Sequence, residues 1–501
     1  MSELFLFVRP PRPLWPFNGP GSAFWPPLAF ASLAAALREQ VPAVRVAILD
    51  APALHMGWAS LAGEIGRLRP TWVGIGEEAV SCVEGLRAAT LAKQAGAGVV
   101  AGGCFFGHVA SEVLATGKVD VVVHGEGERT IVELVEALRC RDGHALRQVR
   151  GISFLEGGEV MRTPGRPLIE DLDCLPLPAY DLLPVQCYGA TSRNHRGLAA
   201  IELGRGCPHA CDFCVLWRQM GTGDAERHLP RLRTKSPDRL LEEVRVPMDQ
   251  FGRRYLGWVD PCFNAHAETP RRLAEGLLRE GRRIGQSAWV RADCVARDLA
   301  SGALEACTRA GFNEAYIGVE RLDPAALRAL GKQGQDDRVR DTLAILHRDH
   351  PGIFKVGTFI YGLPGDTPAS VRALFRGACQ LPLDLALFIP LTPLPGTPGW
   401  SPEAWDPTGA RFRSFSFLPH VNGDPQRARL TRALFAAAAL DWSPARLRRT
   451  LGGMLSADAR RRNITWRQLA RLAPFVAAGL VPGRRGGVGM GGMRIPDWYE
   501  R

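Results

Sequence analysis

The sequence predicts an α/β protein with two parallel sheets and a helical C-terminal region. Three observations support this prediction. The chain has 501 residues, more than the roughly 250–300 that one hydrophobic core accommodates. Strand and helix patterns alternate through residues 1–145, as in a doubly wound parallel sheet. The alternation resumes after residue 197, where six strands fit a partial parallel (βα)6 barrel.

Composition and charge narrow the class of protein. Hydrophobic residues make up 46% of the chain and charged residues 23%, as in ordinary globular proteins. Twelve cysteines without a secretory signal pattern indicate a reducing cytoplasm. No apolar run has the length of a membrane span, so none is predicted. The net charge of +11 comes without an RNA-binding motif, and nucleic acid is not an expected partner.

The N-terminal segment carries glycine-rich turns where a doubly wound sheet binds ligands. Strands are predicted over residues 4–8, 44–49, 72–75, 99–101 and 119–123, and helices over 26–39, 83–95 and 130–139. Gly102 and Gly103 follow the fourth strand, and Gly125, Glu126 and Gly127 follow the fifth. Ligands bind at such carboxyl ends, although tight turns alone explain most of these glycines. Neither turn matches the nicotinamide fingerprint, so that cofactor is not expected.

A joint is predicted over residues 146–196. Residues 151–160 read as a hairpin around a Gly-Gly turn. Residues 164–183 are rich in proline and therefore extended. We expect them to form an ordered connector between domains, because their leucines need a place to be buried.

Three cysteines, Cys207, Cys211 and Cys214, follow a predicted buried strand over residues 198–203. Gly206 and Pro208 are expected to keep this segment out of regular structure. Three thiolates can hold iron or zinc. A structural zinc site would need a fourth ligand, and no second cysteine or histidine pair stands nearby. A four-iron cluster held by three cysteines leaves one iron open. The plain alternative is three core cysteines at chance spacing.

The spacing C-x3-C-x-aromatic-C, with Phe213 as the aromatic residue, resembles the cluster motif of radical SAM enzymes. The resemblance implies a [4Fe–4S] cluster whose open iron binds S-adenosylmethionine. An electron, from a reductant such as flavodoxin or ferredoxin, then cleaves that cofactor to a 5′-deoxyadenosyl radical. Further strands predicted over 255–259, 287–290, 314–319, 355–361 and 385–389 complete the six-stranded barrel of that family.

The same resemblance implies roles for residues at the ends of the barrel strands. Asp260 would contact the amino group of the bound methionine, although a turn or capping aspartate is nearly as good an interpretation. Arg291 would pair with the methionine carboxylate, and Glu320 would contact the ribose or the amino group. The turn that approaches the adenine with backbone atoms contains Gly362, Pro364 and Gly365.

The N-terminal segment resembles the cobalamin-binding domain of one branch of this family. The resemblance rests on PPLAFASLAAALRE, VGIG, AGGC and VVVHGEGE, and it implies that the glycine turns bind cobalamin. The loop after the first strand contains no histidine, so no protein imidazole is expected below the cobalt. Trp15, Phe17 and Trp25 are candidates to pack against the corrin, with ordinary core packing as the alternative.

Several other features of the sequence admit more than one interpretation. Cys262 and Cys294 just follow strand ends, and we interpret them as small buried residues rather than extra ligands, thiyl donors or radical quenchers. The basic residues 218–235 are predicted to form a loop. Helices are predicted over 425–440, 444–451 and 465–480. The last is expected over the barrel mouth rather than on a membrane surface, ahead of a Gly-rich tail at 483–492.

The predicted function is that of a cobalamin-dependent radical SAM enzyme. It would methylate an unactivated carbon of a small-molecule, pigment or lipid substrate through a 5′-deoxyadenosyl radical and methylcobalamin. One alternative is an oxidoreductase or cyclase without methyl transfer, and another is an iron–sulfur electron-transfer or sensor protein. The predicted domains span residues 1–145 (cobalamin-binding-like), 146–196 (connector), 197–400 (barrel) and 401–501 (helical).

Overall fold

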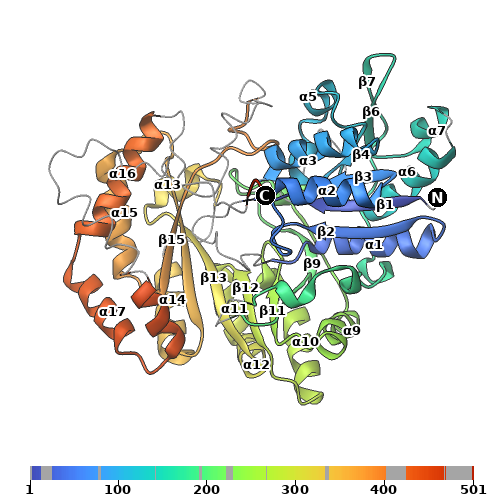
Figure 1. Ribbon diagram of the computed structural model, residues 1–501. Helices are drawn as coiled ribbons and strands as arrows, with labels where there is room; N and C mark the ends of the chain where they lie inside the picture. Colours follow the sequence, from blue (N-terminus) through green and yellow to red (C-terminus); the bar gives the residue numbers. More distant parts are fainter. Residues whose placement is uncertain are drawn as a thin grey trace.

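Two large sheets and one small ribbon organise the molecule (Figure 1). The computed structural model describes residues 3–12, 25–76, 81–140, 143–190, 195–221, 229–266, 268–332, 338–401, 425–467, 469 and 499–501. One sheet has seven strands and the other has six. The ribbon pairs β9 (Gly204–Cys207) with β10 (Arg231–Thr234) in antiparallel fashion.

The N-terminal sheet has the strand order β2-β1-β3-β4-β5-β6-β7. Its strands are β1 (Leu4–Arg9), β2 (Arg45–Asp50), β3 (Trp72–Ile75), β4 (Gly98–Ala101), β5 (Val121–Val123), β6 (Ile152–Glu156) and β7 (Glu159–Arg162). The first five are parallel, which confirms the predicted doubly wound sheet. The β6–β7 hairpin, which we expected in the connector, extends this sheet antiparallel to β5.

Helices cover both faces of this sheet. They are α1 (Leu28–Gln40), α2 (Trp58–Leu68), α3 (Cys82–Gln94), α4 (Gly103–Phe106), α5 (Ala110–Ala115), α6 (Glu128–Cys140) and α7 (Gly143–Gln148). Helices α1 and α6 share one apolar core, and α2 to α5 share another. Helix α2 escaped prediction because its two glycines weaken the helical signal.

The connector is ordered, as predicted. It includes three short 3₁₀ helices, Leu172–Cys174, Tyr180–Leu182 and Val185–Cys187. The Ala179 N–H donates to the Ala31 carbonyl of α1 at 3.0 Å, and the buried Tyr180 hydroxyl donates to the Ala200 carbonyl. The core on the α1 side therefore continues through the connector into the second domain.

The second sheet is the predicted six-stranded parallel barrel segment, in the order β15-β14-β13-β12-β11-β8. Its strands are β8 (Leu198–Ile201), β11 (Tyr255–Trp258), β12 (Gly285–Val290), β13 (Phe312–Glu320), β14 (Phe354–Tyr361) and β15 (Leu385–Pro390). The helices between them are α9 (Pro237–Arg245), α10 (Glu268–Arg279), α11 (Ala292–Ala300), α12 (Ala303–Arg309), α13 (Pro324–Ala329), α14 (Arg338–Asp349) and α15 (Pro368–Gln380).

The C-terminal region packs beside and below this barrel. Helix α16 (Pro425–Leu440) packs on α15, and α17 (Pro444–Met454) follows it (Figure 1). Arg460 contacts Asn313 and Glu314 at the start of β13, and Arg461 pairs with Asp384 at the start of β15. This segment therefore closes the end of the barrel opposite the cysteines. The expected position of the 465–480 helix over the barrel mouth stays a prediction, because only residues 465–467 and 469 of that helix lie within the described part of the chain.

The rest of the predicted last helix and the Gly-rich tail, within residues 470–498, lie outside the described residues. The final residues, 499–501, return to the N-terminal sheet (Figure 1), where the Trp58 N–H donates to the Tyr499 carbonyl at 2.9 Å. In the described part of the chain, no helix has the length and apolar character that crossing a membrane requires.

Candidate functional site

The first predicted metal ligand, Cys207, ends a strand rather than lying in a loop. Residues 204–207 pair with residues 231–234, so both the irregular segment and part of the basic loop that we predicted are strands. Gly206 makes this pairing possible. Its φ is +91°, and a Cβ atom there would lie 2.0 Å from the Arg231 carbonyl oxygen. Gly206, which was expected to prevent regular structure here, instead allows β9 to pair with β10.

The other two cysteines lie in the turn between β9 and helix α8 (Leu216–Gln219). The Cys211 carbonyl accepts bonds from the Cys214 N–H at 3.1 Å and the Trp217 indole at 2.9 Å. The Asp212 N–H donates to the Leu330 carbonyl at 3.0 Å. Phe213 packs on a small apolar cluster formed by Leu330, Ile360 and Leu363. The turn is therefore docked on the carboxyl ends of the barrel strands.

A positive charge lies beside one of the three thiols. The Arg291 guanidinium lies 4.0 Å from the Cys211 sulfur. A hydrogen bond from Cys262, with smaller contributions from His209 and Arg291, lowers the pKa of Cys207 to about 6. Burial raises the pKa of Cys214 to about 11. A deprotonated Cys207 and a nearby guanidinium suit an anionic iron–sulfur cluster.

The donor set fits a cluster better than a single ion. Within the residues the structure describes, no three His, Cys, Asp or Glu side chains are arranged to hold one metal ion. In a cubane cluster each thiolate ligates a different iron, so the sulfurs need not converge on one point. Cys207, Cys211 and Cys214 would hold three irons, and the fourth would stay open at the barrel mouth.

Two further cysteines stand beside this set. The Cys262 thiol is hydrogen-bonded to Cys207 and Cys294, and Cys294 is also bonded to His209. Cys262 is buried, as the packing interpretation predicted, but Cys294 is only partly buried. The closeness of Cys262 to Cys207 was not predicted. The available signal was the position of both cysteines, four residues after the ends of β11 and β12.

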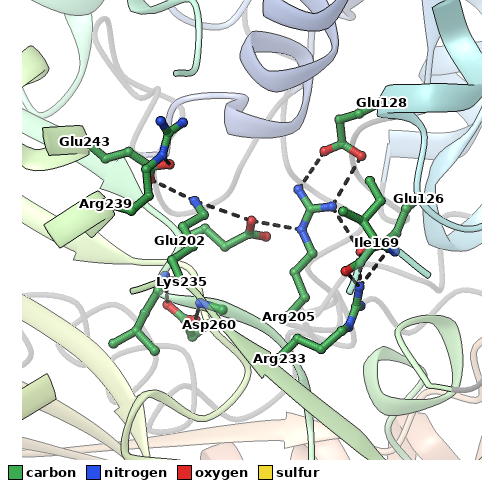
Figure 2. Close-up of polar contacts among 12 residues, drawn as sticks. Glu126, Glu128, Ile169, Glu202, Arg205, Arg233, Lys235, Arg239, Glu243 and Asp260 are labelled. Atoms are coloured by element: carbon green, nitrogen blue, oxygen red, sulfur yellow. Dashed lines mark hydrogen bonds and ion pairs between the residues drawn. The ribbon is translucent and has the colours of Figure 1, made fainter. Parts of the chain in front are cut away.

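Asp260 fixes the start of β9 (Figure 2). Its carboxylate accepts hydrogen bonds from the Leu203 N–H at 3.0 Å and the Gly204 N–H at 2.7 Å. Burial raises its pKa to about 7. Both oxygens thus serve the segment that leads to Cys207, and the contact with methionine stays a prediction.

Arg291 and Glu320 both face the cysteine turn from the strand ends. Arg291 forms a two-point ion pair with Asp293, at 2.9 and 2.7 Å. Glu320 accepts a bond from Lys332 at 2.8 Å and has a φ of +61°, a strained value for a residue with a side chain. Sequence reasoning missed Lys332, which lies in no motif. Contacts of Arg291 and Glu320 with the cofactor stay predictions.

The turn after β14 is held by an ion pair that the sequence analysis also missed. Gly362 and Gly365 have φ values of +86° and +85°, and Pro364 lies between them. The Asp366 carboxylate accepts the Gly362 N–H at 2.8 Å and pairs with the Arg321 guanidinium at 2.8 and 2.9 Å. Asp366 directly follows the predicted motif, which was the available signal. The adenine contact of this turn stays a prediction.

A cavity of about 340 Å³ lies at the carboxyl ends of the N-terminal strands. Its lining includes all five predicted residues of the glycine turns: Gly102, Gly103, Gly125, Glu126 and Gly127. A Cβ atom at Gly103 would lie 2.1 Å from the Gly76 carbonyl oxygen, and one at Gly76 would lie 2.3 Å from the Gly102 carbonyl oxygen. Close backbone approach thus needs these glycines. Phe5, Phe7 and Trp25 supply an apolar wall, which fits the corrin of cobalamin.

The cavity also reaches the second domain. From that domain, the lining includes Glu202, Arg205, Gln219, Met220 and Val259. Of the aromatic residues predicted to pack on the corrin, Trp25 lines the cavity. Trp15 and Phe17 lie outside the described residues.

Comparisons with known proteins agree with this architecture. The model of the radical SAM superfamily matches residues 201–377, and that of the B12 binding domain matches residues 21–135. An uncharacterised methyltransferase of Pyrococcus horikoshii is 31% identical over 381 residues, which cover 75% of this chain and 78% of that protein. The anaerobic magnesium-protoporphyrin IX monomethyl ester cyclase of Cereibacter sphaeroides is 25% identical over 283 residues, 56% of this chain and 44% of the cyclase.

Solved structures show the same fold. The radical S-adenosylmethionine methyltransferase TsrM from Kitasatospora setae matches with a TM-score of 0.60 at 20% identity, over 79% of this chain and 74% of TsrM. The cobalamin-dependent S-adenosylmethionine radical enzyme OxsB matches with a TM-score of 0.60 at 18% identity, over 75% of this chain and 51% of OxsB.

A B12-binding sheet followed by a cysteine-bearing parallel barrel defines a class of iron–sulfur enzymes that use two organic cofactors. The chain belongs to the radical SAM superfamily, in its cobalamin-binding branch. Its cofactors are a [4Fe–4S] cluster, S-adenosylmethionine and cobalamin.

Proposed function

We propose that this enzyme transfers a methyl group to a carbon atom of a small-molecule, pigment or lipid substrate. The observation that carries the proposal is the shared cavity wall. Glycine turns of the B12-binding sheet form one side, and Glu202, Arg205, Met220 and Val259 form the other. When bound, the cluster supplies the electron that cleaves S-adenosylmethionine, and cobalamin supplies a methyl carrier. The chain's own residues hold these two reagents on adjoining surfaces.

The relatives support the substrate class. The hopanoid C-3 methylase of Methylococcus capsulatus is 26% identical over 329 residues, 63% of this chain and 56% of the methylase. The bacteriochlorophyllide d C-12(1)-methyltransferase of Chlorobaculum tepidum is 24% identical over 210 residues, 41% of this chain and 43% of that protein. These two proteins are named for methylation of a lipid and of a pigment. We infer that this chain takes a substrate of comparable chemistry and receives its electron from a reductant such as flavodoxin or ferredoxin.

The competing candidate is an oxidative cyclase that uses the same cofactors without methyl transfer. It is favoured by the similarity to magnesium-protoporphyrin cyclases from three organisms, at 25–26% identity. An electron-transfer or sensor role is the candidate from another class.

We also propose that the chain divides into four parts, at residues 1–145, 146–196, 197–400 and 401–501.

The test begins with anaerobic reconstitution using iron, sulfide and hydroxocobalamin, followed by desalting and metal analysis. We expect about four irons and about one cobalt per chain. Cys207→Ala should lose most of the iron, whereas Cys140→Ala, at an exposed cysteine on α6, should keep it. Iron without cobalt would refute the proposal.

Products of S-adenosylmethionine then separate the candidates. The reconstituted enzyme is incubated with S-adenosylmethionine and a low-potential reductant, and nucleoside products are measured by mass spectrometry. Methyl transfer predicts both S-adenosylhomocysteine and 5′-deoxyadenosine. Formation of 5′-deoxyadenosine alone would favour the cyclase candidate. A reducible cluster that yields neither product would favour electron transfer or sensing.

A further inference from the structure

A buried cluster of charged side chains joins the B12-binding sheet to the strand that carries the first cysteine (Figure 2). Arg205 lies on β9, two residues before Cys207. Its guanidinium bonds both oxygens of Glu128, at 2.6 and 3.2 Å, and one oxygen of Glu126 at 3.0 Å. A third carboxylate, Glu202, accepts from its Nε at 2.9 Å. Arg205 is only 7% exposed.

A second arginine reinforces the same junction. Arg233 on β10 donates from Nη1 to both oxygens of Glu126 at 2.9 Å and to the Ile169 carbonyl at 2.6 Å. The Ile169 N–H donates back to Glu126 at 2.7 Å. Glu126 therefore lies where three segments meet: the turn after β5, the connector and the β9–β10 ribbon (Figure 2).

The other side of the ribbon is tied to the barrel. Lys235 pairs with Glu243 of α9 at 2.8 Å and approaches Glu202 at 3.9 Å. Asp260 holds the backbone just before β9. Strand β9 is thus held between the turn after β5 and the barrel, and Arg205 makes the central contacts.

Overall stability is a weak explanation for such a cluster. Removing charged groups from water costs much of what their attraction returns, so apolar side chains of similar volume would stabilise about as well. Forked arginine–carboxylate pairs supply defined geometry instead. Glu126 comes from the turn after β5 and Glu128 from the start of α6, and both line the cavity. The arginine comes from the strand that ends at Cys207.

We propose that Arg205, with Glu126 and Glu128, is a positioning device that sets the separation between the corrin and the iron–sulfur cluster. This inference rests on the proposed function, since the separation matters only when both cofactors are bound. Arg205 lines the cavity, but in this interpretation it acts through its carboxylate partners rather than by contact with the cobalt or the cluster. It acts by holding the turn after β5 and strand β9 at one spacing.

The test measures this separation directly. Pulsed dipolar EPR is applied to the holoenzyme with cob(II)alamin and the reduced cluster, since each carries unpaired spin. The variants are Arg205→Lys, which keeps the charge but loses the fork, and Glu128→Gln, which keeps the shape but loses the charge. The matched control is Arg231→Lys in the same ribbon, where the partner is the exposed Glu170.

Wild type and Arg231→Lys should show one narrow distance distribution. Arg205→Lys should bind both cofactors yet show a broadened or shifted distribution. Its ratio of 5′-deoxyadenosine to S-adenosylhomocysteine should rise about tenfold, because small misplacements of reactants are costly. Glu128→Gln should behave in the same way, and it decides the matter if Arg205→Lys does not fold.

The outcomes separate the two proposals. Cofactor-loaded variants with an unchanged distribution would overturn the positioning role and leave the proposed function standing. A wild-type protein that binds no cobalamin would overturn the proposed function and this inference with it, at the metal-analysis step.

Discussion

Replacing Gly206 with alanine should separate the two strands that present Cys207. At the observed φ of +91°, an alanine costs about 1–2 kcal/mol. The new Cβ would also lie 2.0 Å from the Arg231 carbonyl oxygen, so the strands must move apart by more than about 1 Å. Losing about two hydrogen bonds adds about 2 kcal/mol. The total is about 3–4 kcal/mol.

Gly252→Ala is the matched control. Gly252 also has a positive φ, +62°, but its Cβ would meet nothing within 4 Å. It should therefore cost only the conformational part, about 1–2 kcal/mol. Differential scanning fluorimetry of the anaerobic holoenzyme should separate the two melting temperatures by about 4–8 °C. Iron content should fall only in Gly206→Ala. Equal melting temperatures and equal iron in both variants would refute the steric argument.

Asp260→Asn should change how stability depends on pH. The folded state raises the pKa of Asp260 from 3.8 to about 7. Its contribution to stability is therefore full below about pH 4 and is lost as the pH rises through about 7. The melting temperature of the wild type, minus that of Asp260→Asn, should therefore fall between pH 4.5 and 7.5. A difference that stays constant over this range would contradict the prediction. Asp366→Asn should cost about 2–4 kcal/mol in denaturant unfolding, because it leaves the buried Arg321 without its charged partner. It should also weaken S-adenosylmethionine binding, measured by calorimetry on the cluster-loaded enzyme. Asp349→Asn, in an exposed pair, should change stability by less than about 0.5 kcal/mol, and an equal loss in both variants would argue against a special role for Asp366.

Local patterns were enough to predict the two sheets and the cysteine motif. The strands and the Cys207, Cys211 and Cys214 spacing are properties of consecutive residues, which apolar periodicity reports well. The same reasoning failed for β9. Gly206 reads as a strand breaker, yet its positive φ is what β10 requires as a partner. The partner strand lies 24 residues further on, and local propensity carries no information about it.

The same limit applies to the residues of the candidate site. Strand-end positions such as Arg291, Glu320 and Gly362 could be singled out because parallel strands bring their carboxyl ends together. Lys332, which pairs with Glu320, and Asp366, which pairs with Arg321, were not found, since an ion pair depends on side-chain directions that only packing sets. The same holds for Cys262, whose thiol lies beside Cys207 only in the folded chain.

What the sequence determined by itself was the order of strands and helices, the cluster motif and the glycine turns. Each of these features depends on residues that are close together in the sequence. The tertiary structure decided how the two cofactor sites are joined. Arg205 and Glu128 are 77 residues apart, and Arg233 and Glu126 are 107 apart. Their pairing follows from the approach of two independently wound sheets, because only packing brings buried charges of opposite sign within hydrogen-bonding distance.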